Sequence, residues 1–396
     1  MLQGTIILMP HRGKIGYSLI IVMAVVAIAA VYLFAFNGNS TSRISSSLCA
    51  AYPFTVSPIA IGNFTSIAPL GNVNPGGEHI LPTNHLYFSF PVSANGSALP
   101  EAVPVYSPGN VTIYDVQVSD YLNSSGGIVQ TDYSVMFSVC PNVSGYFNHI
   151  ITLSSILQSE LTNETCSQDF PISIGTITSI RNCDYKLNVP IAAGTVIGTA
   201  GGTSNQAGGA AMDFGLTDTR VKLQFANQSR YTSVYNDSVC PIDYYTPAMQ
   251  AELDSYFSDY SYSQHNGSWP VCGEVDQDIK GTLQGNWFHG GVNLNSPNVW
   301  ANELSIIHDN GNPADYIIDW GGTIAPAGMI SFTPSYNGTQ NVEPGLVKPS
   351  PKVYCYGNYG IYIMAELPNN DTLEVQYGVG SCPSNPVFSN ATVYSR

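Results

Sequence analysis

The sequence predicts a mainly β protein in which an N-terminal transmembrane helix is followed by two extracytoplasmic β domains. Three observations predict this class. The 396 residues include 37 Gly and 26 Pro with no triplet period, which is typical of many turns between short strands. An uncharged apolar run lies near the N-terminus, and all eight cysteines follow it. Only 12 residues are Lys or Arg against 27 Asp or Glu, so no basic patch is available for phosphates and we expect no nucleic-acid partner.

The first 48 residues predict how the chain meets the membrane. The run at residues 15–36 carries no charge and, at about 1.5 Å per residue, is long enough to cross a hydrocarbon core of about 30 Å. Arg12 and Lys14 precede it, so the positive-inside bias places residues 1–14 in the cytoplasm as a short tail and the C-terminal region outside. Residues 37–48 are rich in Ser and predict a flexible stalk. A cleaved signal peptide is the competing interpretation, but the run is longer than the roughly 7–15 residues of a signal core. We therefore expect a single-pass protein of the cell membrane.

The cysteines and the glycosylation motifs favour an oxidising compartment outside the membrane. An even number of cysteines without any C-x-x-C spacing predicts disulfides at Cys49, Cys140, Cys166, Cys183, Cys240, Cys272, Cys355 and Cys382. Asn-x-Ser/Thr motifs are spread along the same region, at Asn63, Asn95, Asn110, Asn123, Asn142, Asn163, Asn227, Asn236, Asn266, Asn337, Asn370 and Asn390, with one more at Asn39 in the stalk. A chain rich in Asn, Ser and Thr also produces such motifs by chance, so a glycosylated surface is one of two interpretations.

Short apolar or β-branched runs predict the strands of the extracytoplasmic region. They are separated by Gly, Pro and Asn and lie at Val111–Val118, Ser134–Val139, Thr176–Ile180, Val221–Phe225, Tyr316–Trp320, Gly360–Ala365 and Thr372–Tyr377. One short helix is expected at Thr246–Ser258, where Pro247 suits the first helical position, and a weaker helix signal covers Ser154–Leu161. The cysteines divide four and four about residue 230. We therefore expect two separately cross-linked domains, residues 49–230 and 231–396, the second a β-barrel or β-sandwich, with three possible pairings in each half.

Several segments of residues 73–218, read in order, resemble the lysostaphin-type zinc metallopeptidases, which cut peptide crosslinks of bacterial cell walls. HLYFSF at His85–Phe90 resembles the family's first ligand motif, His-x-x-x-Asp. AVPVYSPGNVTIYDV at Ala102–Val116 is similar to its next hairpin. SGYFNHIITLS at Ser144–Ser154 resembles the strand that carries a histidine of the family's active site, and the glycine-rich Val189–Leu216 resembles the segment that leads into its closing His-x-His motif. The resemblance implies a small β-sandwich or barrel core for residues 49–230.

The resemblance also implies a zinc site, but the sequence departs from the family at several of its positions. A catalytic zinc site needs three protein ligands and an open position for water. His85 matches the first ligand, whereas Ser89 stands in place of the Asp, and Ala211 and Asp213 stand in place of the two histidines of His-x-His. His149 takes the place of the active-site histidine on the middle strand. Two imidazoles and one carboxylate could still hold zinc or a similar ion if they converge.

The candidate site residues are therefore His85, Asp213 and His79 for a metal, and His149 for catalysis as a base. Glu78, beside His79, is a further substitute ligand. The alternative interpretation is that these histidines are hydrogen-bonded packing residues of a β domain, because seven His in the whole chain are no enrichment.

Two functions from different classes follow. The one we favour is a membrane-anchored extracytoplasmic glycoprotein of the cell envelope, whose peptidase-like domain serves binding or structural roles without catalysis. Its partners would be the membrane, through residues 15–36, and cell-surface proteins or glycans. The alternative is a membrane-tethered, metal-dependent peptidase or hydrolase with a rearranged zinc site. The substitutions at Ser89, Ala211 and Asp213 favour the first, because they remove groups that hydrolysis needs.

Overall fold

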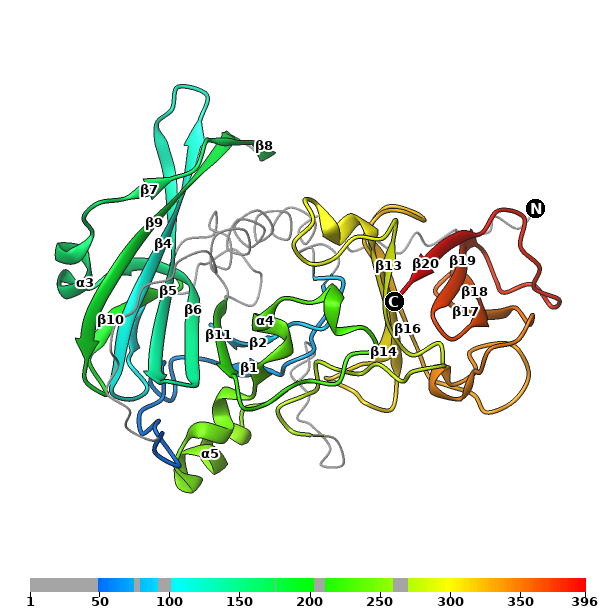
Figure 1. The fold of residues 1–396 in the computed structure, drawn as a ribbon, viewed down its shortest axis with the longest axis horizontal. Coiled ribbons are helices and arrows are strands. Elements are labelled where there is room, and N and C mark those ends of the chain that lie inside the picture. Colours follow the sequence, from blue (N-terminus) through cyan, green and yellow to red (C-terminus); the bar gives the residue numbers. More distant parts are fainter. Residues whose placement is uncertain (1–48, 75–78, 92–100, 175, 203–210, 259–269) are drawn as a thin grey trace, which may run out of the picture.

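The computed structural model describes residues 49–74, 79–91, 101–174, 176–202, 211–258 and 270–396. In these ranges no helix is both long and apolar enough to cross a membrane. The predicted tail, membrane segment and stalk (residues 1–48) lie outside the described residues, as do Glu78, Asn95 and Asn266. The described chain is mainly β, as the sequence predicts, and its strands form two sheets, one coloured blue to green and the other yellow to red in Figure 1.

The first sheet has 12 strands, all paired antiparallel. They are β1 (Ser66–Ala68), β2 (His85–Ser89), β3 (Val103–Tyr106), β4 (Val111–Asn123), β5 (Ile128–Cys140), β6 (Val143–Leu153), β7 (Thr165–Cys166), β8 (Phe170–Ile174), β9 (Ile177–Ile191), β10 (Val196–Ala200), β11 (Ala211–Asp218) and β12 (Ser238–Val239). The order along the sheet is β1-β2-β11-β6-β5-β4-β9-β7, and β10 bridges β3 and β6. The strands expected at Val111–Val118 and Ser134–Val139 lie within the longer β4 and β5, and the one expected at Thr176–Ile180 begins one residue before β9. The run expected at Val221–Phe225 is not a strand.

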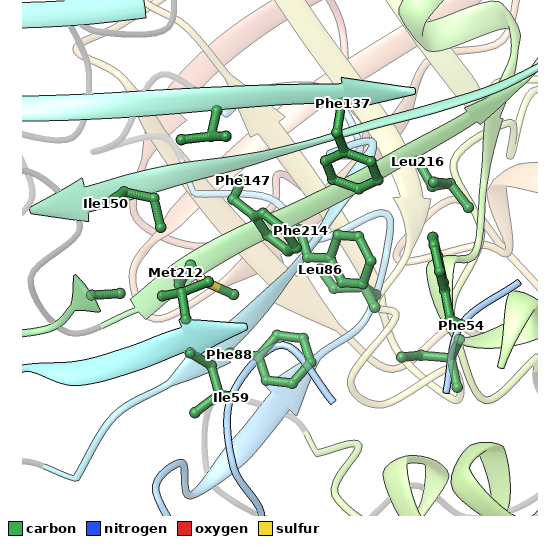
Figure 2. Packing of buried hydrophobic residues seen from close by; sticks show 14 of the residues in the cluster. Phe54, Ile59, Leu86, Phe88, Phe137, Phe147, Ile150, Met212, Phe214 and Leu216 are labelled. Atoms are coloured by element: carbon green, nitrogen blue, oxygen red, sulfur yellow. The ribbon is translucent and has the colours of Figure 1, made fainter. Parts of the chain in front are cut away.

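One face of this sheet carries an aromatic core. Phe137 on β5, Phe147 on β6 and Phe214 on β11 point to the same side of the sheet, where Phe54 joins them (Figure 2). The ring centroids of Phe147 and Phe214 are 4.8 Å apart, and those of Phe54 and Phe214 are 6.0 Å apart. Packing of this kind adds about 0.5–1.5 kcal/mol per aromatic pair to the burial of the rings.

The helices of the described chain are short. They are α3 (Ser155–Glu160), α4 (Ser233–Asn236) and α5 (Pro247–Asp254), with 3-10 turns at Gln228–Arg230, Pro241–Tyr244, Val299–Asn302 and Pro344–Leu346. Helices α3 and α5 lie where the two helix signals predict them, and Ser154 caps α3 by accepting from the backbone N–H of Leu157. The core of the first sheet includes Leu253 on α5 and Val275, and it reaches Phe288. The expected short helix thus packs on the first body, and that body extends past the expected boundary at residue 230.

The second sheet has eight strands that form a nearly closed barrel. They are β13 (Gly285–His289), β14 (Glu303–His308), β15 (Tyr316–Trp320), β16 (Gly328–Phe332), β17 (Tyr354–Asn358), β18 (Ile361–Asn369), β19 (Thr372–Val379) and β20 (Thr392–Ser395), in the order β16-β15-β14-β13-β20-β19-β18-β17. The two ends meet, because Asn358 on β17 donates to the carbonyl of Ser331 on β16 at 2.6 Å. The second body is therefore a barrel, one of the two expected forms.

Several large aromatic side chains fill the barrel, among them Trp287, Tyr316 and Tyr356. Trp287 is fully buried inside and donates its indole N–H to the carbonyl of Leu283. The Arg396 guanidinium lies 3.9 Å from the centre of the Trp287 ring system. These contacts make Trp287 a packing residue of the barrel.

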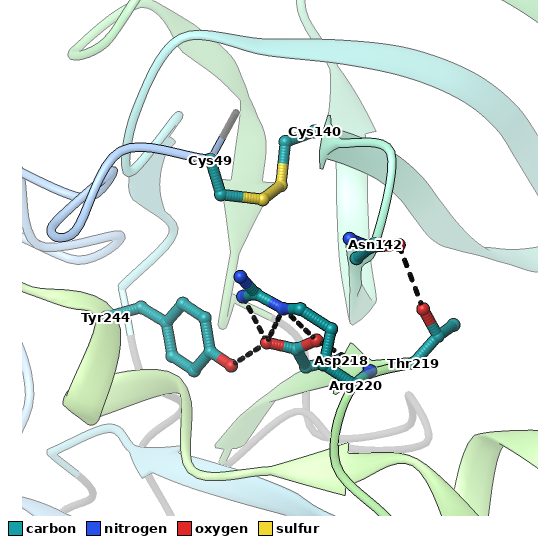
Figure 3. Close-up of a disulfide and its surroundings, with 7 residues drawn as sticks. All are labelled: Cys49, Cys140, Asn142, Asp218, Thr219, Arg220 and Tyr244. Atoms are coloured by element: carbon teal, nitrogen blue, oxygen red, sulfur yellow. Dashed lines mark hydrogen bonds and ion pairs between the residues drawn. A yellow bond between two sulfur atoms is a disulfide. The ribbon is translucent and has the colours of Figure 1, made fainter. Parts of the chain in front are cut away.

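Four disulfides link the described cysteines, and none is free among them. The pairs are Cys49–Cys140, Cys166–Cys183, Cys240–Cys272 and Cys355–Cys382, so each expected half pairs its own four cysteines. The predicted disulfides are confirmed. Cys49–Cys140 ties the first described residue to the end of β5, close to Asp218, which binds the Arg220 guanidinium and accepts from the Tyr244 hydroxyl (Figure 3).

The described glycosylation motifs lie at accessible positions. Exposed asparagines are Asn63, Asn110, Asn142, Asn163, Asn337, Asn370 and Asn390, and half-buried ones are Asn123, Asn227 and Asn236. The Asn236 side-chain nitrogen faces the carbonyls of Gln228 and Tyr231, so a glycan there would disturb both contacts. Glycosylation stays a prediction at these sites.

Candidate functional site: a buried histidine–carboxylate network

Three adjacent strands bring the predicted site residues together. His85 lies on β2, Asp213 on β11 and His149 on β6, and β11 pairs with both other strands. On β2 and β11 these side chains alternate with the core residues, so they lie on the face of the sheet opposite the phenylalanines. His85 is 3% exposed, His149 5% and Asp213 0%. The order of the strands therefore converts three distant sequence positions into one buried polar cluster.

The backbone of β6 is distorted where it carries His149. This residue has φ 65°, in the left-handed region that non-glycine residues seldom occupy. The pairing of β6 with β5 also shifts register here, between the pairs Tyr133–Ile150 and Val135–Phe147. Bulges are frequent where a side chain must be redirected. The backbone at His149 is therefore strained, and tertiary contacts must hold it in this conformation.

One carboxylate oxygen is the centre of the cluster. Asp213 Oδ2 lies 3.5 Å from Nε2 of His85 and 3.4 Å from Nε2 of His149, and it accepts from the Asn148 side-chain nitrogen at 3.2 Å. On its other side, His149 Nδ1 lies 3.0 Å from Oδ2 of Asp132, a buried residue of β5. His149 is therefore held between two carboxylates.

Two polar neighbours orient the ring of His85. Its Nδ1 lies 3.2 Å from Oδ1 of Asn84 and 3.3 Å from the hydroxyl oxygen of Tyr146. Tyr146 reaches His85 across Gly215, which is paired with both residues on the neighbouring strands. A Cβ on Gly215 would lie about 2.2 Å from the Tyr146 ring, so glycine leaves the space for this contact.

The charges of the cluster follow from burial and from these neighbours. Burial alone would lower the pKa of His149, but the charges of Asp213 and Asp132 outweigh it and raise that pKa well above its ordinary value. Burial raises the pKa of Asp213, but nearby His85 and His149 outweigh it and hold the carboxyl ionised. Burial lowers the pKa of His85, and burial together with His85 lowers that of His79 to about 3. Near neutral pH the cluster thus contains one imidazolium and two neutral imidazoles.

The fourth predicted residue, His79, lies at the edge of the cluster. Its ring centroid is 5.6 Å from that of His85 and 6.2 Å from that of Tyr87. His79 is half-buried and precedes β2 in the chain. It therefore contributes an aromatic contact to His85.

The donor set suits zinc chemically, and its arrangement in the described chain is that of a network of ion pairs and hydrogen bonds. In the described part of the chain, no group of three or more His, Cys, Asp or Glu side chains is placed to hold a metal ion. Asp213 Oδ2 already faces three nitrogen atoms, whereas a carboxylate oxygen offers about two lone pairs. Ser89 pairs with Ala211 across β2 and β11. The position of the family's Asp ligand and that of the first histidine of His-x-His therefore face each other, and neither carries that group.

Asp132, Asn148 and Tyr146 belong to the cluster but were not predicted from the sequence. Asp132 lies at the start of β5, and its contact with His149 depends on the register of the β5–β6 pair and on the bulge. No local motif surrounds it. The polar residues that alternate with aromatics in SGYFNH were the one available signal for Tyr146 and Asn148.

Comparison with known proteins adds no family to these observations. No protein-family model matches the chain, and no curated protein matches it. The resemblance to the lysostaphin-type peptidases therefore remains a prediction that rests on the segments given above.

Proposed function

We propose that the protein is a membrane-anchored, extracytoplasmic protein of the cell envelope, whose peptidase-like β domain serves binding or structural roles without hydrolysis. The observation that carries the proposal is the closed ion-pair network of Asp132, His149 and Asp213. In this network an imidazolium lies between two carboxylates, at the place where the resemblance implies a metal centre. The imidazolium of His149 therefore supplies, from the chain itself, the positive charge that a metal ion would bring to this place.

Three properties of the network support a non-catalytic role. A histidine that acts as a general base must be unprotonated near its working pH, and two carboxylates favour the protonated form of His149. The residues that would act on a substrate are almost fully buried, and a polymer substrate needs an open cleft. Ser89 and Ala211 supply neither a strong metal ligand nor a proton-transfer group.

The extracytoplasmic location is supported by the disulfides. Four pairs use every described cysteine, and disulfides form and persist in oxidising compartments. With the apolar run at residues 15–36, this favours a tethered protein whose partners are proteins or glycans of the cell surface.

One observation favours a second candidate, a metal-dependent hydrolase. In a tetrahedral zinc site two ligand atoms lie about 3.3 Å from each other. The distances of 3.4 and 3.5 Å from Asp213 Oδ2 to the two imidazole nitrogens are close to this value. Asp213 Oδ1 and Asn148 Oδ1 are also buried without a hydrogen-bond partner. In this candidate His85, His149 and Asp213 would hold the ion.

An assay of hydrolysis separates the two candidates. The full-length protein would be equilibrated with zinc and incubated with crosslinked peptides of the cell-wall type, and products would be measured by mass spectrometry beside the His85→Ala variant. We expect no product above buffer for either protein. Zinc-dependent cleavage by the wild type that the variant lacks would overturn the proposal.

The location is tested separately in cells that express the full-length chain. A protease added outside intact cells should digest residues 49–396 and leave an epitope on residues 1–14 protected. Protection of the C-terminal region would contradict the extracytoplasmic assignment.

A further inference from the structure

The outer face of the barrel packs against the first body through strands β13, β14 and β15. Ser305 on β14 donates its hydroxyl to the carbonyl of Ile80 at 2.7 Å. On the same face, Ile307 on β14 and Ile317 on β15 form a small apolar cluster with Val73. The alternating residues of these strands, Trp287, Leu304, Ile306 and Ile318 among them, fill the barrel instead. Polar residues on this outer face are thus enclosed between the two bodies.

A row of polar side chains crosses the enclosed face. Asn286 on β13 pairs with Ser305, which in turn pairs with Asp319 on β15. Asn286 is 1% exposed and Asp319 0%. Glu303 lies two residues before Ser305 on β14, on the same face, and is also buried. Asn286 and Asp319 therefore lie one strand spacing away on either side of Ser305, and Glu303 lies about 6.6 Å along the strand from it.

The charge of Asp319 has no protein counter-ion in the described chain. Neither oxygen has a hydrogen-bond partner, although the backbone N–H of Trp320 lies near, and no ion pair includes the residue. Two arginines that contact rings of β13 are engaged elsewhere, Arg230 with the carbonyl of Val292 and Arg396 with that of Thr282. Burial raises the pKa of Asp319 well above its ordinary value, and the charge of Glu303 adds to this.

A single proton does not satisfy the acceptors on this face. One proton on Asp319 supplies a single donor, whereas both Asp319 side-chain oxygens and Asn286 Oδ1 are buried without a hydrogen-bond partner. A divalent cation would neutralise both carboxylates and use the amide oxygen as well. The donor set is made only of oxygen, which calcium prefers and zinc does not.

We propose that a calcium-class divalent cation binds between the barrel and the first body, held by Asp319, Glu303 and the side-chain oxygen of Asn286. The ion lies where the two bodies meet, because its ligands come from the barrel face that Ile80 and Val73 cover. This site is separate from the histidine–carboxylate network and does not depend on the function proposed for it.

The test uses the full-length protein after removal of divalent ions with a chelator. Calcium chloride would be titrated in by isothermal calorimetry, with magnesium chloride as the comparison. We expect one equivalent of calcium to bind the wild type and to raise its thermal midpoint. Asp319→Asn and Glu303→Gln, which keep the side-chain shapes, should each lose both effects.

Glu374→Gln provides the matched control, because Glu374 is a strand carboxylate of the same barrel on β19. This variant should bind calcium as the wild type does. Equal calcium binding by Asp319→Asn would overturn the proposal by placing the ion elsewhere. The proposal would also be overturned if the wild type bound no calcium and Asp319→Asn were at least as stable as the wild type. Asp319 would then be a protonated carboxyl.

Discussion

Removing the charge of Asp213 while keeping its shape, by Asp213→Asn, tests whether the ion-pair network holds the first body together. The carboxylate is fully buried and faces His85, His149 and Asn148 through one oxygen. Breaking a buried ion pair by removing one partner costs about 3–5 kcal/mol, because the other charge stays buried. We expect Asp213→Asn to lower the free energy of unfolding by about this amount, or the thermal midpoint by about 6–20 °C.

The measurement is a urea titration of the full-length protein followed by circular dichroism. Asp169→Asn is the matched control, because its partner Arg181 lies in the same sheet and both side chains are about 40% exposed. An exposed pair of this kind contributes about 0–1 kcal/mol. Equal effects of Asp213→Asn and Asp169→Asn would refute the reasoning, since the buried network would then contribute no more than a surface pair.

The same variant should change how stability depends on pH. The pKa of His149 is raised above its unfolded value of 6.5, so its contribution is fully present below pH 6.5 and is lost as the pH rises through the folded pKa. Asp213→Asn removes one of the two charges that raise this pKa. The variant should therefore lose less stability than the wild type between pH 7 and 10, and parallel profiles would contradict this assignment.

Three further changes test the packing and the cross-links. Phe214→Ala should lower the free energy of unfolding by about 3–5 kcal/mol, because the ring is fully buried among other phenylalanines, and a loss below about 1 kcal/mol in a urea titration would contradict this. Replacing Cys49 and Cys140 together by Ser should cost about 4–5 kcal/mol, because the disulfide closes a separation of 91 residues, whereas an unchanged midpoint would argue against the pairing. The pKa of Asp218 is lowered to about 2 by its hydrogen bond with Arg220, so this contribution is present above pH 3.8 and lost as the pH falls toward 2. The free energy of unfolding of Asp218→Asn should therefore depend less on pH in that range than that of the wild type. An unchanged pH dependence would show that Asp218 makes no such contribution.

Much of the fold follows from local patterns that the sequence displays. Alternation of apolar and polar residues predicted parts of β4, β5 and β9, and Pro247 after Thr246 predicted α5. The choice between barrel and sandwich did not follow, because it depends on the contact between β16 and β17, which are separated in the chain and at the two ends of the sheet order. The extent of the first body also depends on packing, since Leu253 and Val275 join its core from beyond residue 230.

The candidate site could be predicted only in part for a related reason. His85, His149 and Asp213 were found because they lie on three segments whose order resembles a known family. Asp132 was missed because its contact depends on strand register and on the left-handed backbone of His149, which no sequence pattern displays. The resemblance implies a metal ligand at Asp213, and the structure places this carboxylate between two imidazoles.

The most direct test of the account is the zinc content of the protein. Full-length wild type and the His85→Ala/Asp213→Ala double variant would be equilibrated with zinc, dialysed and measured by elemental analysis. The account predicts well below one equivalent in both proteins, because an imidazolium occupies the centre of the network. One equivalent of zinc in the wild type that is lost in the double variant would contradict it and establish the network as a metal site.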